Sequence, residues 1–176
     1  HVAYRKGLMV MHCLEQLMGE AQLNAALRAY CERFALSEDG FAVSFDLIQE
    51  LVEHSPADIK DLLSELLEEV SWYDNRLIGA ELNRESVRLM VETQRFLATD
   101  DGVDESVPLE LPIEVALLDE QGDEIVRRRV TVTKADPVVE LSLPTGVAGP
   151  VKAVLDPDLW YLDIDLRNNF SSIIIE

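Results

Sequence analysis

The sequence predicts an α+β fold: an N-terminal helical bundle of about four helices over residues 1–75, then an antiparallel β-sandwich of immunoglobulin or fibronectin-like type over residues 76–176. Apolar residues recur at helical spacing in the first part, and from Arg76 onward they alternate with polar ones, with turn signals between segments. The chain has 176 residues, of which 48% are hydrophobic, enough to form a buried core in one large or two small domains.

The first predicted helix covers Tyr4–Met18 and ends at Gly19, which suits a left-handed helix end. A second helix over about Glu20–Ala35 follows so closely that the two should form an antiparallel hairpin. The expected buried stripe of the first helix comprises Gly7, Val10, Met11, Leu14, Leu17 and Met18.

Two further helices complete the predicted bundle. Residues 36–43 form a loop, and Ser44 is expected to cap a helix over Phe45–Glu53. In Ser55-Pro56-Ala57-Asp58, the serine is an expected cap, the proline fits the first helical position and the aspartate fits a capping box. That helix should run to about Val70.

The second half of the chain predicts about six short strands bounded by turns. Asp119–Asp123 is expected to be a hairpin turn, residues 100–105 a polar loop, and Trp160–Asn169 a further edge strand. The predicted strands are Leu77–Leu82, Ser86–Leu97, Ile113–Leu118, Glu124–Val132, Val138–Leu143 and Val151–Leu155.

The formal charge of −19, from 15 basic and 34 acidic residues, is spread evenly along the chain. Such a field repels nucleic acid and anionic lipid, so we expect no nucleic-acid partner and attribute the charge to solubility. No apolar run is long enough to span a bilayer, and no secretory segment opens the chain. Because the chain begins with His1, we expect it to be a processed or cloned piece of something longer.

The residues alone predict no complete active site. Only His1, His12 and His54 are histidines, and none belongs to a two-histidine zinc motif. A nucleophile motif, a phosphate-binding loop and a dinucleotide fingerprint are all missing from the sequence. Cys13 and Cys31 are expected to be buried free thiols, although a disulfide between adjacent helices stays open.

Two polar segments of the chain, an arginine run and an aromatic junction, have predicted structural roles. In Arg127-Arg128-Arg129 the outer pair should share one strand face and pair with carboxylates, which we favour over an anion site. Arg128 points the other way and needs a partner if it is buried. Trp72–Arg76 reads as a hinge between the two parts, packed by Trp72, with a ligand role left open.

Tyr4-Arg5-Lys6-Gly7 and the helix that follows resemble the Tyr-x-Lys-Gly segment of zinc aminopeptidases of the aminopeptidase-N (gluzincin) type. Residues Ala26–Phe34 and Ser44–Leu51 resemble the next helices of that family. Trp72–Arg76, the β-rich region and Ala153–Pro157 resemble the subgroup in which the peptidase unit is fused behind an ABC-transporter permease.

The resemblance implies one catalytic residue, Tyr4, whose hydroxyl would donate a hydrogen bond to the oxyanion of the peptide under hydrolysis. The zinc ligands of the family lie upstream of this tyrosine and are absent here, so we expect no metal or cofactor site and no activity in this piece alone. Zinc, a peptide substrate, an upstream catalytic half and a membrane-associated location belong to the implied full-length parent. Apolar surface exposed by the missing half should favour dimers of the fragment.

Two other functions stay open at this stage. The parent would be a non-catalytic scaffold or binding module beside a permease if it has lost its zinc motif. An unrelated adaptor with helices and a sandwich is the third reading.

Overall fold

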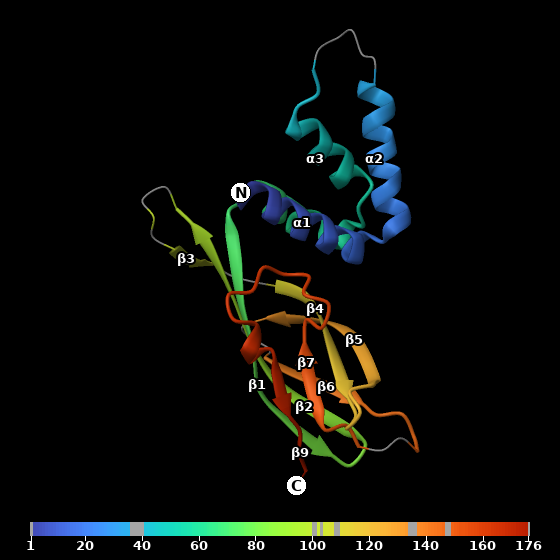
Figure 1. The fold of residues 1–176 in the computed structure, drawn as a ribbon, viewed down its shortest axis with the longest axis vertical. Helices are drawn as coiled ribbons and strands as arrows, with labels where there is room; N and C mark the ends of the chain where they lie inside the picture. Colours follow the sequence, from blue (N-terminus) through green and yellow to red (C-terminus); the bar gives the residue numbers. More distant parts are fainter. Residues whose placement is uncertain are drawn as a thin grey trace. The chain divides into compact units, whose positions relative to one another are not determined.

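The computed structural model describes residues 2–35, 41–99, 102, 104–107, 110–133, 137–146 and 149–175. Helices come first and two β-sheets follow (Figure 1), which confirms the predicted α+β class. The chain divides into two compact units, a helical unit over His1–Ser71 and a β unit over Trp72–Glu176. The boundary expected after Asn75 falls inside the first strand.

The helical unit contains α1 (Val2–Met18), α2 (Glu20–Phe34), α3 (Ser44–Glu53) and α4 (Lys60–Glu68), with a 3₁₀ turn at Ala57–Ile59 before α4. Gly19 links α1 to α2 with a φ of 88°, a left-handed conformation that glycine adopts without strain. The helices pack through apolar side chains at helical spacing. The fully buried ones are Cys13, Leu14, Ala26, Leu51 and Leu63.

Two of the predicted helix caps are wrong. Helix α3 already includes Ser44, and the backbone N of Val43 donates to the Asp46 carboxylate at 2.9 Å. Ser55 is buried at the end of α3, where its hydroxyl donates to the Leu51 carbonyl at 2.6 Å instead of capping the next helix. Carbonyl groups in the last turn of a helix lack partners, so a nearby hydroxyl is used there.

The first sheet contains β1 (Ser71–Asn83), β2 (Ser86–Ala98), β3 (Asp104–Val107), β6 (Val138–Ser142) and β9 (Ile174–Ile175). Strand β1 pairs with β2. The other edge of β2 is shared, because β6 pairs near the start of the strand and β3 near its end. The short β1–β9 pair is parallel, whereas the predicted sandwich was purely antiparallel.

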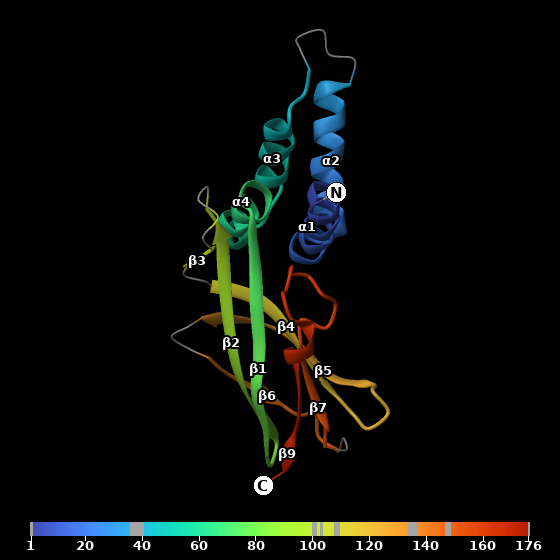
Figure 2. The ribbon, with the colours of Figure 1, turned by 60° about the vertical axis from the view of Figure 1, so that its left-hand side comes forward.

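The second sheet has the order β5 (Glu124–Thr133), β4 (Glu110–Leu118), β7 (Lys152–Leu155) and β8 (Phe170–Ser172), and all its pairs are antiparallel. The two sheets form a sandwich-like unit (Figure 2). Its core is built from alternate residues of the long strands, as the sequence alternation predicted. The fully buried ones include Val87 and Leu89 of β2, Leu111, Ile113, Val115 and Leu117 of β4, and Ala153 and Leu155 of β7.

Three β-strand predictions need correction. The Trp160–Asn169 stretch is a loop with a 3₁₀ turn at Leu166–Asn168, and its apolar residues are not buried at every second position as in a strand. Strand β3 occupies part of the predicted polar loop. Strand β1 starts at Ser71 instead of Leu77, since the alternation that buries Leu77 already begins at Tyr73 and Asn75.

Candidate functional site

Tyr4, for which the resemblance implies a catalytic role, lies in the first turns of α1, and its side chain lies outside the described residues. Of the predicted stripe on this helix, Val10, Leu14, Leu17 and Met18 are buried and Met11 is half-buried. Gly7 is exposed, and the side chain of Leu8 is 72% exposed. Gly7 and Leu8 are therefore open to solvent, while the later turns of α1 anchor the helix in the bundle.

Lys6, within the same Tyr-x-Lys-Gly segment, has a structural contact. Its ammonium donates a hydrogen bond to the backbone carbonyl of Glu69, the residue just after α4. Partial burial lowers the pKa of Lys6, and the nearby Glu69 carboxylate opposes that shift. A cation at a helix C-terminus is favoured by the unsatisfied carbonyls and the helix dipole. Lys6 thus ties α1 to the end of α4.

The Trp72–Arg76 segment lies on β1 and is held by packing and ion pairs. Trp72 stacks on Phe96 with ring centroids 6.3 Å apart, and Tyr73 packs on Tyr161 at 5.0 Å. The guanidinium of Arg76 donates twice to the buried carboxylate of Asp74. These hydrogen bonds to Asp74 hold the pKa of Arg76 above its usual value. The contacts in this segment all support the strand and its neighbours.

Asp163 connects the C-terminal loop to the edge of β1. One carboxylate oxygen accepts from the backbone N of Asn75 at 3.1 Å and from Nδ2 of Asn169 at 3.1 Å. The other oxygen accepts from the backbone N of Asp165 at 2.9 Å. The loop also exchanges backbone hydrogen bonds with Tyr73 on both sides of Asp163. Three N–H donors use most of the acceptor sites of this carboxylate, and all three belong to this loop or to β1.

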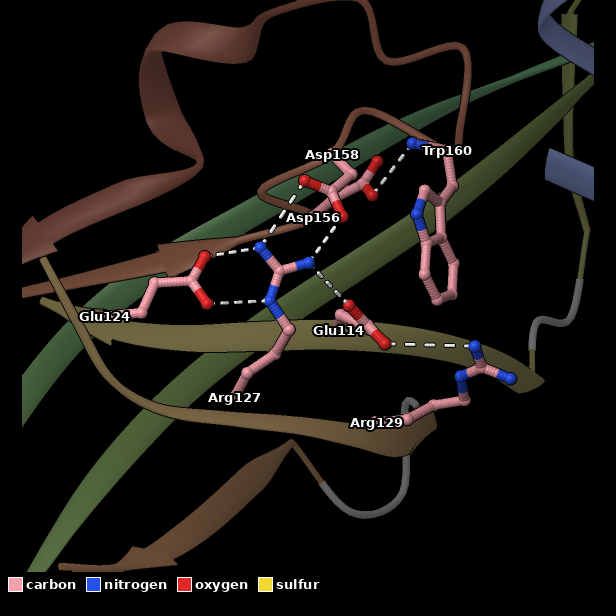
Figure 3. A network of polar contacts seen from close by, with 7 residues as sticks. All are labelled: Glu114, Glu124, Arg127, Arg129, Asp156, Asp158 and Trp160. Atoms are coloured by element: carbon pink, nitrogen blue, oxygen red, sulfur yellow. Dashed lines mark hydrogen bonds and ion pairs between the residues drawn. The ribbon is translucent and has the colours of Figure 1, made fainter. Parts of the chain in front are cut away.

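The arginine run lies on β5, where Arg127 is surrounded by carboxylates (Figure 3). Its guanidinium pairs with Glu114 of β4 at 3.0 Å, with Glu124 of its own strand, and with Asp158 of the C-terminal loop. These hydrogen bonds hold the pKa of Arg127 above its usual value and that of Glu124 below it. The prediction that the outer arginines pair with carboxylates is thus confirmed for Arg127.

Arg129 extends the same network. It lies 3.8 Å from the Glu114 carboxylate, and its guanidinium carbon sits 4.7 Å from the centre of the Trp160 ring. Stacking a guanidinium on an indole gives a favourable cation–π contact. Arg128 points away from these groups and is exposed, so the conditional need for a buried partner does not arise. Among the residues that the structure describes, none forms an ion pair with it.

The loop that carries Asp158 is built around Asp156, which sequence reasoning did not single out. Asp156 is 1% exposed, and its two carboxylate oxygens accept the backbone N–H groups of Trp160 at 2.9 Å and Tyr161 at 3.1 Å. The φ of Asp156 is 50°, a left-handed conformation that aspartate tolerates better than most residues. The available signal was an Asp-Pro pair followed closely by two large aromatic residues.

Burial raises the pKa of Asp156 to about 6, and the two backbone N–H bonds reduce that shift. The neighbouring Asp163 and Asp158 carboxylates raise it further. A buried carboxylate with a raised pKa can mark a catalytic acid. Here both oxygens are occupied by the loop backbone, and Tyr161 is fixed by donating its hydroxyl to the Pro112 carbonyl at 2.6 Å. We assign Asp156 to loop structure.

The remaining candidate groups are also structural or dispersed. His54 ends α3 with Nδ1 2.8 Å from the Glu50 carbonyl, and Glu50 pairs with Arg33 at 3.2 Å. Cys13 and Cys31 are free thiols; Cys13 is buried as expected, but Cys31 is exposed, so its predicted burial is wrong. Within the described ranges, no three His, Cys, Asp or Glu side chains are grouped to hold a metal ion.

One pocket of about 550 Å³ lies on the first sheet, lined by residues of β1, β2 and β6. Its charged lining residues are Glu81, Arg88 and Glu140, and Arg88 faces Glu140 in the strand register. Cross-strand pairs of opposite charge support a sheet and do not by themselves indicate a ligand.

No protein-family model matches this chain, and no curated protein matches it in sequence. Over the part of the chain that the structure describes, no helix is both long and apolar enough to cross a membrane.

Proposed function

We propose that this chain is the tyrosine-bearing, C-terminal part of a membrane-linked zinc aminopeptidase-like protein. In this proposal Tyr4 donates a hydrogen bond to the oxyanion that develops as a peptide bond is hydrolysed. The support is the resemblance of residues 4–19 to the aminopeptidase-N type. The observation that carries the proposal is the exposure of Leu8, which lies four residues after Tyr4 on α1 and is 72% exposed.

An exposed leucine at a helix end is what we expect if an upstream catalytic half covers this surface. The later turns of α1 are partly buried, and Lys6 binds the residue after α4, so the helix that carries Tyr4 is anchored in its unit. A neutral donor held where negative charge develops stabilises the transition state more than the substrate.

The zinc of this proposal belongs to the upstream half. The described residues offer no set of ligands that fits it, so we assign no metal-dependent step to this chain. The partners of the proposal are that upstream half and a peptide substrate. Its location is a membrane, through a permease in the same protein.

The decisive experiment replaces Tyr4 in the full-length protein and measures peptide hydrolysis. We expect Tyr4→Phe to lower kcat by about a hundredfold or more with little change in KM, because the lost hydrogen bond forms mainly in the transition state. The matched control is Tyr30→Phe, which removes a hydroxyl from α2 where the ring packs on Phe34. A Tyr4→Phe variant with normal kcat contradicts the proposal.

A non-catalytic scaffold or binding module is the second candidate. It is favoured by the use of charged groups in the β unit, where Asp74, Asp156 and Asp163 all bind backbone or neighbouring side chains. The full-length protein would then show no zinc-dependent hydrolysis of any peptide, with or without Tyr4.

A further inference from the structure

We propose that the free edge of β5 binds an extended peptide segment, which adds a strand to the second sheet and places one carboxylate against Arg128. This interaction surface is independent of the catalytic role proposed for Tyr4. It rests on the position of β5 in the sheet, on the exposure of its core-facing side chains, and on the charge of one arginine.

Strand β5 is an edge strand of ten residues. It stands at the end of the sheet order, and among the described strands β4 alone pairs with it. Figures 1 and 2 both place it at the margin of the β unit. Every second residue of an edge strand directs its N–H and C=O groups away from the sheet, and such groups can pair with another chain. Peptide recognition by strand addition uses this geometry.

The core-facing side chains of β5 are incompletely covered. Val126, Arg128 and Val130 lie in register with Leu117, Val115 and Ile113 of β4. Those three β4 residues are fully buried, whereas the two valines are half-buried and Arg128 is exposed. The opposite sheet contacts β5 through β2 and β6, but at these three positions it covers β5 less completely than β4. An added strand would lie beside this row and shield its apolar part from water.

Arg128 supplies the charge preference of this edge. Its neighbours on either side are compensated, Arg127 by three carboxylates and Arg129 by Glu114 and Trp160. Of these three arginines, only Arg128 has no anionic partner among the described residues, in a chain of net charge −19. A carboxylate on an added strand, directly across from Arg128, would form a favourable cross-strand pair.

The chemistry of the partner follows from these features. The overall negative charge disfavours a strongly acidic peptide at long range. The fitting segment has β-branched residues at alternate positions and a single carboxylate in their centre. A second copy of the chain is less suitable, because antiparallel pairing centred on Arg128 brings like charges together. A shifted register would place Glu124 against Arg128, so the experiment must measure self-association.

The test uses three synthetic peptides in which valine and threonine alternate. In each peptide the central valine is replaced, by glutamate, glutamine or lysine. Binding to the isotope-labelled chain is followed by amide chemical shifts. We expect the glutamate peptide to bind most tightly, with shifts and exchange protection concentrated on β5. Arg128→Gln should weaken binding of that peptide about tenfold, the value of one charged pair. Arg28→Gln on the exposed face of α2 should leave it unchanged.

A charge-reversal variant gives a second test, which does not depend on loss of binding. Arg128→Glu should reverse the preference, so that the lysine peptide binds better than the glutamate peptide. The proposal is overturned if the three peptides bind alike, if the shifts lie away from β5, or if Arg128→Gln has no effect. It is also overturned if sedimentation shows a dimer whose β5 amides are already protected, because the edge then belongs to a second copy.

Discussion

The helical unit and the β unit are stabilised in different ways. In the helical unit, apolar residues at helical spacing fill the interior, and the polar contacts between elements include Lys6 with Glu69 and Arg33 with Glu50. In the β unit, an apolar core is combined with the buried carboxylates of Asp74 and Asp156 and the half-buried carboxylate of Asp163, which bind loops and strand edges.

The difference follows from where each backbone finds its hydrogen bonds. A helix satisfies its own N–H groups, apart from those at its ends. The irregular segment after β7 has no such pattern, yet it includes the buried Trp160 and Tyr161. Its buried N–H groups need acceptors, and aspartate side chains supply them. A polar network in this unit is thus a requirement of the loop and gives no evidence of catalysis.

The two units can be followed separately in one sample. Both tryptophans, Trp72 and Trp160, belong to the β unit, whereas far-ultraviolet circular dichroism at helix wavelengths reports chiefly on α1 to α4.

Truncating one core leucine in each unit should give the largest effects. Leu51 of α3 and Leu89 of β2 are both fully buried. Leu51→Ala and Leu89→Ala should each lower the free energy of unfolding of their own unit by about 2–5 kcal/mol. Denaturation of Leu89→Ala should shift the tryptophan transition, and that of Leu51→Ala the helical signal. If each variant shifts both signals equally, the units unfold as one and the comparison fails.

Because of the buried carboxylate of Asp156, the β unit should be less stable at neutral pH than at acidic pH. Its pKa is raised from 3.8 to about 6 in the folded state, so the folded state binds a proton that the unfolded state has released. The stabilisation is fully present below pH 3.8 and is lost as the pH rises through about 6. The loss attributable to this residue should be of the order of 2–3 kcal/mol.

The measurement is denaturant unfolding followed by tryptophan fluorescence from pH 4 to pH 7. Glu124 and Asp165 have lowered pKa values and act in the opposite direction, so the difference between wild type and Asp156→Asn is the informative quantity. Asparagine keeps one acceptor for the loop and removes the titration. A variant whose stability follows the same pH curve as wild type would show that Asp156 does not titrate in this range.

Loss of Arg127 should have a smaller effect, again confined to the β unit. Arg127→Met leaves Glu114, Glu124 and Asp158 close together without their shared cation, and should cost about 1 kcal/mol at low salt. The cost should shrink as salt is added. Arg128→Met is the matched control on the same strand, with an expected change within about 0.5 kcal/mol. Equal effects of the two substitutions would contradict the assigned network.

Removing Lys6 should produce the smallest change, in the helical unit. Lys6→Met keeps the aliphatic stem but loses the hydrogen bond to the Glu69 carbonyl, for an expected cost of about 0.5–1 kcal/mol. Thermal unfolding followed by circular dichroism is the measurement, with Lys60→Met at the start of α4 as control. If Lys6→Met is as stable as Lys60→Met, the contact contributes nothing to the fold.

Much of the fold was predictable because it depends on periodic patterns. Leu14, Leu17 and Met18 bury as the helical spacing requires, and Val87, Leu89 and Val91 as strand alternation requires. Ser55 was misread because a serine before proline suits a helix start equally well on local grounds. Its actual acceptor, the Leu51 carbonyl, belongs to the preceding helix.

The polar framework of the β unit was less accessible from the sequence. Asp156 binds backbone groups four and five positions away, but its burial depends on how the loop lies on the strands, and Asp163 binds Asn75 from a distant part of the chain. The pairing of Arg127 with Asp158 joins β5 to that loop across many residues, and no local pattern encodes it. A single sequence indicates which face of each helix or strand is buried, whereas contacts between distant segments are known only from the three-dimensional structure.

The parallel pairing of β1 with β9 joins the opening and closing segments of the β unit. During synthesis β1 and β2 can form a hairpin early, but Glu81 and Leu82 must wait for Ile174 and Ile175. Throughout that interval the C-terminal end of β1 keeps one unpaired strand edge, which a neighbouring nascent chain can bind. Completion of this sheet is therefore governed by the last residues of the unit to leave the ribosome.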